Sequence, residues 1–143
     1  MSAAGPPPIE TGASDVQVLP VIPETAAALC RLAASLGLDA VRIDLADCGD
    51  KAAFLQRTAM ALEFPAWFGG NWDAFYDCLA DLAWRPGDGH VLVFEHAGAM
   101  RRDAPEALDT AISILRDAAE AWRARDATFR VFVDGPPAAD AGG

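Results

Sequence analysis

Three aspartates recur four residues apart, at Asp73, Asp77 and Asp81. On an α-helix, side chains at i and i+4 lie on one face, so these carboxylates would form one acidic ridge. Carboxylates one turn apart, with Cβ atoms about 5–6 Å from each other, have the chemistry of a general acid and a general base. The same ridge could instead bind a basic ligand, or form a solvated acidic face.

Catalysis is the less favoured of these possibilities. A hydrolase needs a cleft that orients its substrate between two carboxylates, and adjacent acids on a convex helix provide none. His90 and His96 have no third ligand at a metal-like spacing, and Gly69-Gly70 lacks the lysine of a phosphate loop. No serine or cysteine stands beside a histidine in a nucleophile motif. We therefore expect no enzyme, no catalytic residue, no metal site and no cofactor.

The residues before the ridge predict the helix that carries it. Phe64-Pro65 ends a preceding helix, because proline disfavours helical geometry in the residue before it. Gly69-Gly70 supplies a turn, and Asn71 is a good N-cap. From Asn71 to Trp84, apolar residues fall within about 80° of one another and predict a buried face opposite the acids. This stripe consists of Trp72, Phe75, Leu79 and Leu82.

Aromatic residues accompany the acidic ridge. They are Trp67, Phe68, Tyr76 and Trp84. Aromatic anchors beside fixed charges are typical of the energetic centre of a protein–protein interface. Periodicity alone leaves open which of these rings belong to the core instead.

The run from Phe64 to Leu79 resembles the signature of the barstar family, the intracellular inhibitors of secreted bacterial ribonucleases. The signature combines an apolar-Pro start, an aromatic pair, Gly, Asn, an apolar residue with Asp-Ala, and a second Asp followed by Cys-Leu. The corresponding residues are Phe64-Pro65, Trp67-Phe68, Gly69, Asn71, Trp72-Asp73-Ala74, Phe75-Tyr76-Asp77 and Cys78-Leu79. The matching arrangement of elements extends from about Val41 to Asp134.

The resemblance also implies roles for individual residues. Asp77 would enter the active site of the nuclease, with Asp73 supporting it at the rim. Trp67 matches the aromatic anchor, and Tyr76 stands where the family more often has tryptophan. On the last helix the family uses an acid, which corresponds to Asp117, one methylene shorter than the expected glutamate, or to Glu120 as a substitute. Gly70 departs from a position that is frequently acidic. The expected partner-binding set is Trp67, Phe68, Gly69, Asn71, Asp73, Tyr76, Asp77, Asp81, Asp117 and Glu120.

Strands alternate with helices along the chain, which predicts an α/β fold with parallel pairing. The predicted strands are 41–45, 91–94 and 129–133, and the resemblance implies a small three-stranded parallel sheet packed against helices. We expect a flexible Pro/Ala/Gly-rich arm at 1–22, with 16–22 extended on the surface. An extra N-terminal helix at 23–40, a barstar-like domain at 41–134 and a disordered tail at 135–143 complete the prediction.

Composition limits the classes of partner. The chain has 143 residues, 52% of them hydrophobic, a net charge of −10 and a pI near 4.4. Such acidity argues against binding nucleic acid and favours basic protein partners. No apolar run has the length of a membrane span, and the N-terminus lacks the pattern of a signal peptide, so we expect a cytoplasmic protein. Cys30, Cys48 and Cys78 are expected to be reduced thiols.

The sequence therefore predicts an inhibitor of a basic secreted ribonuclease, whose acidic helix face mimics substrate phosphate. Two alternatives remain open. The first is a stress-associated barstar-like binding module whose target is not a nuclease. The second is an enzyme built on this fold, which would require turnover that Asp73→Asn abolishes.

Overall fold

The computed structural model describes residue 9 and residues 13–136, so the expectations for 1–8, 10–12 and 137–143 lie outside the described residues. Strands and helices alternate over most of this length. In chain order they are β1 (Ser14–Leu19), α1 (Pro23–Ser35), β2 (Asp39–Asp44), α2 (Lys51–Leu62), α3 (Trp72–Asp81), β3 (His90–Glu95), α4 (Gly98–Asp103), α5 (Pro105–Arg123) and β4 (Phe129–Asp134).

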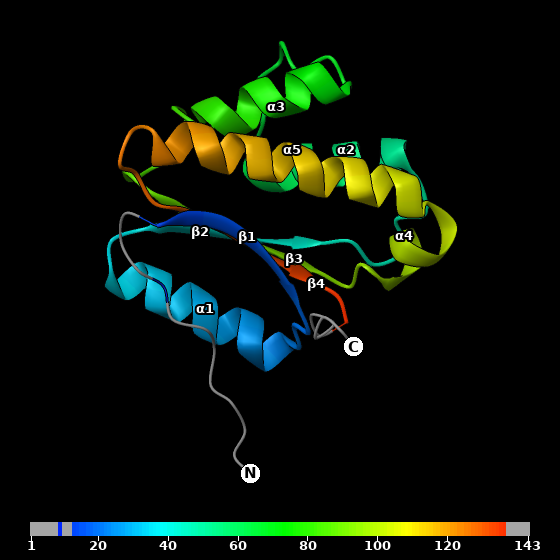
Figure 1. Ribbon diagram of the computed structural model, residues 1–143, viewed down its shortest axis with the longest axis horizontal. Coiled ribbons are helices and arrows are strands. Elements are labelled where there is room, and N and C mark those ends of the chain that lie inside the picture. The colour runs from blue at the N-terminus through cyan, green and yellow to red at the C-terminus, as the bar shows by residue number, and fades with distance from the viewer. Residues whose placement is uncertain (1–8, 10–12, 137–143) are drawn as a thin grey trace.

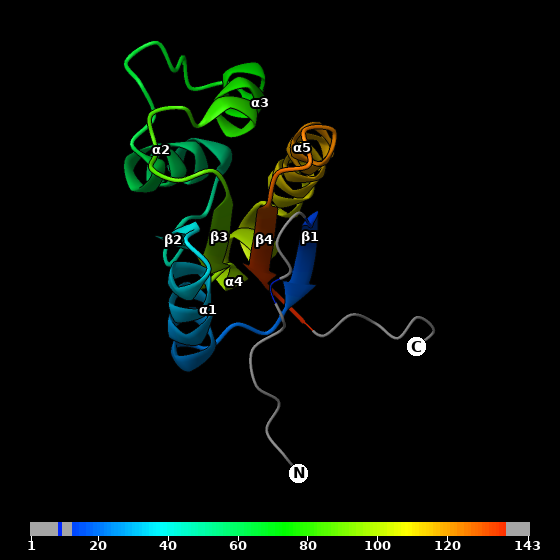
Figure 2. The ribbon, with the colours of Figure 1, turned by 90° about the vertical axis from the view of Figure 1, so that its left-hand side faces the viewer.

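The elements form layers around one sheet (Figure 1). Helix α1 covers one face of the sheet, and α2 and α5 cover the other. Helix α3 lies farthest from the sheet, on top of α2 and α5 (Figure 2). Among the described helices, none combines the length and the apolar character that crossing a membrane requires.

The strands pair in parallel throughout, in the order β1-β4-β3-β2. The predicted parallel α/β architecture is therefore confirmed. All six residues of β3 are buried, as its continuous apolar run predicts for a strand covered on both faces. The expected number of strands, however, was wrong, because the sheet has four strands instead of three.

The additional strand is β1, which comes from the segment expected to be a flexible arm. Its residues pair with β4 from Ser14↔Phe129 to Leu19↔Asp134. Ser14 Oγ also donates a hydrogen bond to the carbonyl of Ala127 and accepts one from the amide of Phe129. Val16 and Val18 pack against the core beneath α5, so the segment gains burial as well as backbone hydrogen bonds. These contacts explain why residues 14–19 are not a loose surface arm.

Helix α1 builds a second, smaller core on the other face of the sheet. Leu29 and Ala33 are fully buried, and they pack with Val91, Val93 and Phe132 of the two central strands. The apolar residues of this segment are buried only in part, since Leu32 and Leu36 remain 37% and 44% exposed. Without α1, this face of the central strands would be open to water.

A buried polar cluster joins the amino-terminal ends of β2 and β3. His90 Nδ1 lies 2.9 Å from a carboxylate oxygen of Asp39, and Arg85 donates two hydrogen bonds to the same carboxylate. The ring of Trp122 packs edge-on against His90. Burial lowers the pKa of His90 and outweighs the opposing effect of Asp39. For Asp39, burial acts to raise the pKa, but the hydrogen bonds from Arg85 and His90 hold it below its usual value.

We predict that this cluster makes the fold less stable in mild acid. Because the pKa of His90 lies below its ordinary value of 6.5, the unfolded chain binds the proton more readily, and stability falls as pH drops through that value. Urea unfolding of the wild type at pH 7.5 and pH 5.5, about one unit on either side of that value, should show the loss. His90→Gln, whose amide can still donate to Asp39, should reduce the difference in unfolding free energy between the two pH values.

His96 provides the matched control, because its bond to Asp44 raises its pKa and gives the opposite dependence on pH. His96→Ala should therefore leave the acid-induced loss of stability in place. Because His96 offsets part of the loss in the wild type, the decisive protein is this variant. A stability of His96→Ala that is constant or rises between pH 7.5 and 5.5, about one unit around the usual histidine value, would contradict the account.

Candidate functional site

The acidic ridge lies on α3, whose start follows the local rules of the sequence. Glu63 ends α2 in a left-handed conformation, and Gly70 adopts a positive φ of 73° that favours glycine. The Asn71 side chain then accepts a hydrogen bond of 2.8 Å from the amide of Ala74, which caps the new helix. The prediction of a helix that begins after Asn71 is confirmed.

The inner face of α3 is anchored by apolar packing and one buried hydrogen bond. Phe75 and Leu79 are fully buried in the main core, and Cys78 is fully buried beside them. Trp122 of α5 donates its indole N–H to the carbonyl of Leu79 at 2.9 Å. The predicted stripe of Trp72, Phe75, Leu79 and Leu82 thus faces inward, although Trp72 is only half-buried.

A surface hollow of about 600 Å³ separates α3 from α5. Its lining combines carboxylates with an apolar floor. The residues are Trp72, Asp73, Tyr76 and Asp77 from α3, and Ile114 and Asp117 from α5. We call this feature the acidic hollow. It brings together four of the ten expected partner-binding residues, including the acid from the last helix.

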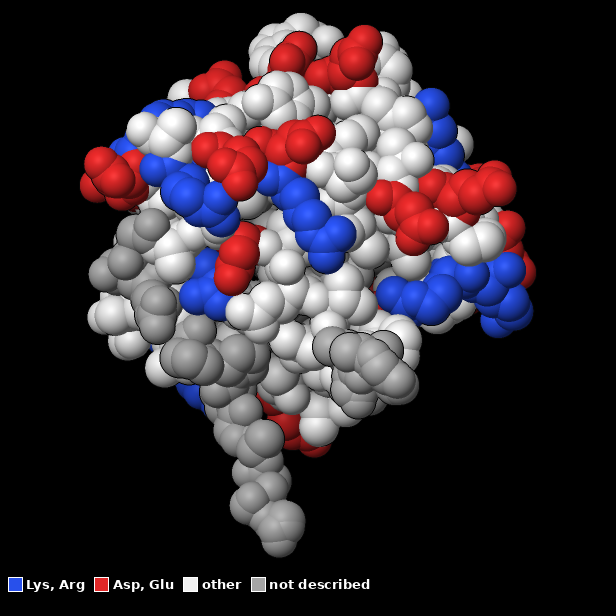
Figure 3. Space-filling model, viewed as in Figure 1, with Lys and Arg blue, Asp and Glu red and all other residues white. Residues whose placement is uncertain are grey.

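The three carboxylates of the acidic hollow are exposed, and none forms an ion pair or side-chain hydrogen bond within the described part of the chain. Acidic side chains also spread across the upper part of the face in Figure 3, over α3 and α5. Burial, with smaller contributions from Asp77 and Asp81, raises the pKa of Cys78 to about 11. Cys78 is therefore a protonated thiol at neutral pH and not a nucleophile.

The other expected site residues lie around the acidic hollow, not in it. Trp67 is 55% exposed on the loop between α2 and α3. Phe68 packs edge-on against Phe64 and, with Gly69, lines a separate shallow hollow against α2. Trp84 is half-buried and donates its indole N–H to the carbonyl of Leu62.

Three acidic or polar residues of the expected set have other surroundings. Asn71 is occupied as the helix cap described above. Asp81 is the last residue of α3 and does not line the acidic hollow. Glu120 pairs with Arg123 and faces the side of α5 that borders β1. Of the two candidates for the acid of the last helix, Asp117 is the one that lines the acidic hollow.

Trp72 and Ile114 line the acidic hollow although neither belongs to the expected partner-binding set. Trp72 was assigned to the core stripe, and its position at the first turn of α3 leaves one side of the indole exposed to the hollow. Ile114 is not one of the buried residues of α5, which are Leu108, Ala111, Ile112, Leu115, Ala118, Ala119 and Trp122. An apolar residue off the buried stripe of an amphipathic helix was the signal that could have identified it.

The arrangement is suited to binding cationic groups. The carboxylates accept hydrogen bonds from guanidinium or ammonium groups, and Trp72, Tyr76 and Ile114 provide the apolar contact that such side chains need beside the charge. No group of three or more His, Cys, Asp or Glu side chains suited to a metal ion occurs among the residues that the structure describes.

A parallel α/β domain that exposes unpaired acids and aromatic residues on a rigid helix pair has the features of a protein-recognition module. The comparison with protein families makes the class specific. The family model for Barstar (barnase inhibitor) matches residues 38–134, and the chain belongs to the barstar family. No curated protein matches the chain. Strand β1 and helix α1 precede the matched residues.

The capping role of Asn71 can be tested separately from any partner. Asn71→Ala should lower the free energy of unfolding by about 1 kcal/mol, because an N-cap hydrogen bond is lost. Asn71→Ser, which can still cap α3, should restore most of that loss. Chemical denaturation of the three proteins measures both effects. Equal stability of the alanine variant and the wild type would show that the cap contributes nothing.

Proposed function

We propose that the chain inhibits a basic secreted ribonuclease by covering its active site with the acidic hollow and the loop before α3. Members of the family are ribonuclease inhibitors. The observation that carries the proposal is the convergence of Asp73, Asp77 and Asp117, three exposed carboxylates from two helices, on one hollow. Such an array suits a partner site that presents arginine, lysine and histidine to a phosphodiester.

The proposed mechanism is mimicry of the substrate phosphate. A carboxylate on a rigid helix accepts charge-assisted hydrogen bonds from the same cations that would hold a phosphate. Asp77 has the central role, with Asp73 at its side and Asp117 contributing from the second helix. Tyr76, Trp72 and Ile114 supply apolar contact, and Trp67 is an exposed anchor next to this surface.

Electrostatics also support rapid association with a basic partner. The chain carries a net charge of −10, and the carboxylates of the acidic hollow have no internal cation to neutralise them among the described residues. A negative surface of this kind raises the encounter rate with a positively charged protein. The unpaired acids repel one another in the free protein, and a bound cationic partner would reduce this repulsion.

A second candidate is a barstar-like binding module whose target is not a nuclease. Two observations favour keeping it. Strand β1 and helix α1 lie outside the matched residues and add surface beyond the family domain. Gly70 and Asp117 also depart from the expected residue types. The two candidates share the acidic hollow and differ in the partner.

The mutation that best tests the proposed function is Asp77→Ala. It should weaken binding to a basic ribonuclease by about 2–5 kcal/mol, because it leaves buried cations of the partner unpaired. Asp81→Ala on the same helix is the matched control and should change binding by about 0–1 kcal/mol, as expected for an exposed charge outside the centre. Titration of the inhibition of a basic bacterial ribonuclease measures both losses.

Circular dichroism and urea unfolding should show that the two variants fold alike, because both residues are exposed. Equal, small losses of inhibition would place the binding site elsewhere. If the wild type binds no basic ribonuclease but retains a basic partner of another class through Asp77, the second candidate function replaces the first.

A further inference from the structure

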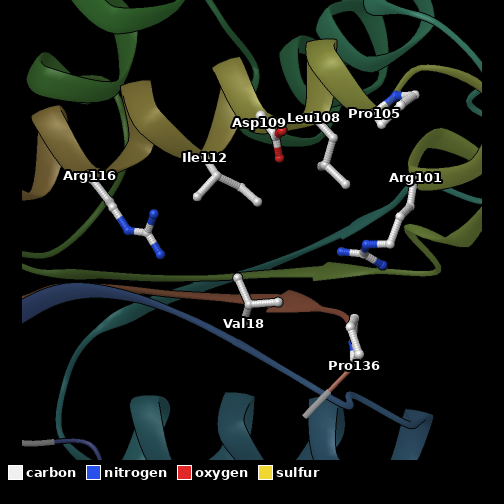
Figure 4. Close-up of a pocket in the computed structure, with 8 residues that line it drawn as sticks. All are labelled: Val18, Arg101, Pro105, Leu108, Asp109, Ile112, Arg116 and Pro136. Atoms are coloured by element: carbon white, nitrogen blue, oxygen red, sulfur yellow. The ribbon is translucent and has the colours of Figure 1, made fainter. Parts of the chain in front are cut away.

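A second groove runs between α5 and β1, on the side of α5 away from the acidic hollow. Its wider part is a cavity of about 410 Å³ whose floor is apolar (Figure 4). Val18 of β1 points upward into it, and Leu108 and Ile112 point downward from α5. A smaller hollow of about 400 Å³ continues the groove along Val16. Because β1 forms one wall, this groove depends on a strand outside the residues matched by the family.

The strand that forms the wall has an open edge. The carbonyls of Ala13 and Leu19 accept hydrogen bonds from the amides of Phe129 and Gly135, so the odd-numbered residues of β1 direct their backbone groups toward β4. Backbone direction alternates along a strand, and the groups of Val16 and Val18 therefore point away from β4. Since β1 is the terminal strand of the sheet, no described strand pairs with these groups.

Two guanidinium groups lie at opposite ends of the wider cavity, one from Arg116 on α5 and one from Arg101 on α4. Arg101 donates one hydrogen bond of 3.0 Å to the carbonyl of Asp134, which fixes its position and leaves other N–H donors available. Arg116 is exposed and forms no ion pair with any described residue. Asp109 is the single acid in the lining of the wider cavity, which therefore carries two guanidiniums and one carboxylate. In the smaller hollow, Asp15 and Glu120 pair with Arg130 and Arg123, and Asp117 is the remaining acid.

We propose that this groove binds an extended peptide segment of a partner protein, which adds a strand to the open edge of β1 beneath α5. The backbone of the peptide pairs with the N–H and C=O groups of Val16 and Val18. Its alternate side chains point toward α5, with an apolar residue over Val18 and Ile112 and an acidic residue on either side of it, next to Arg116 and Arg101. Edge strands with a helix above them bind peptides in this way in other folds.

This occupant follows from the combination of features. A small anion would use the arginines and leave the apolar floor and the backbone edge unused. A basic segment, of the kind the acidic hollow suits, would be repelled by both guanidiniums. The wider cavity and the acidic hollow therefore favour groups of opposite charge, and Asp117 lies at the boundary, lining both the acidic hollow and the smaller end of this groove. This inference does not depend on the proposed function.

The probe is the heptapeptide acetyl-Thr-Glu-Thr-Val-Thr-Glu-Thr-amide, which is symmetrical in sequence and so tests both strand directions. Added to the full chain, it should shift the amide resonances of Val16 and Val18 saturably in heteronuclear NMR spectra. The control acetyl-Thr-Thr-Glu-Val-Glu-Thr-Thr-amide has the same composition, but its glutamates face away from the valine side. The control peptide should bind at least about tenfold more weakly, because it cannot form the charge-assisted hydrogen bonds to the two arginines.

Variants of the protein and the peptide separate the contributions. Arg116→Gln should weaken binding of the first peptide by about tenfold, and because Arg116 is exposed and unbonded the fold should persist. Two further peptides carry an N-methyl group, one on the valine nitrogen and the other on the nitrogen of the next threonine. Because neighbouring N–H groups of a strand point in opposite directions, only one of the two faces β1, and only that methylated peptide should fail to bind. Asp73→Ala should leave peptide binding unchanged.

Several results would overturn the proposal. These are no saturable shift at Val16 and Val18, equal binding of the two peptides, or no effect of Arg116→Gln. Binding only after removal of residues 1–8 would assign the groove to that segment of the chain. Concentration-dependent shifts of the same amides without peptide would assign it to a second copy of the chain.

Discussion

The attachment of α3 to α5 is the interaction on which the proposed site depends. Carboxylates that repel one another can be held together only if the elements that carry them are fixed by something stronger. Here Phe75 and Leu79 are fully buried in the main core, and Trp122 donates its indole N–H to the carbonyl of Leu79. Burial of side chains of this size contributes about 1.5–3 kcal/mol each, which exceeds the few tenths of a kcal/mol lost for each pair of neighbouring acids.

The rest of the core supports the same attachment. The ring of Trp122 stacks on Phe129 of β4, and Arg125 lies over the same indole and donates to the carbonyl of Ala80 at the end of α3. The position of Asp117 relative to Asp77 is thus set by α5, and the position of α5 by the sheet. An acidic surface built in this way is rigid before it meets a partner, so little conformational entropy would be lost on binding.

Local sequence rules predicted α3 well and its surroundings less well. Pro65, Gly70 and Asn71 specify a break, a turn and a cap through effects within a few residues, and the helix follows them. Periodicity left open whether Trp84 belongs to the core or to the surface. Its bond to the carbonyl of Leu62 depends on tertiary packing, which periodicity does not report. The expectation that Asp117 acts together with the ridge likewise came from the family resemblance and not from the sequence pattern of α5.

Strand β1 was missed for a related reason. Its partner strand begins at Phe129, 115 residues after Ser14, and the only local signal is a short polar–apolar alternation before Pro20. A strand that pairs with a distant edge gains its stability from that edge, so its own sequence needs few strand-forming residues. The consequence is functional as well as structural. The N-terminal unit covers one face of the sheet through α1 and forms a new groove with α5 through β1.

The central claim is that unpaired carboxylates on a rigid helix pair attract and occupy a cationic protein site. Stopped-flow measurement of association with a basic ribonuclease, over a range of ionic strength, tests it most directly. The account predicts that the association rate constant falls steeply as salt is added, while the dissociation rate constant changes little. An association rate constant that does not respond to ionic strength would contradict it.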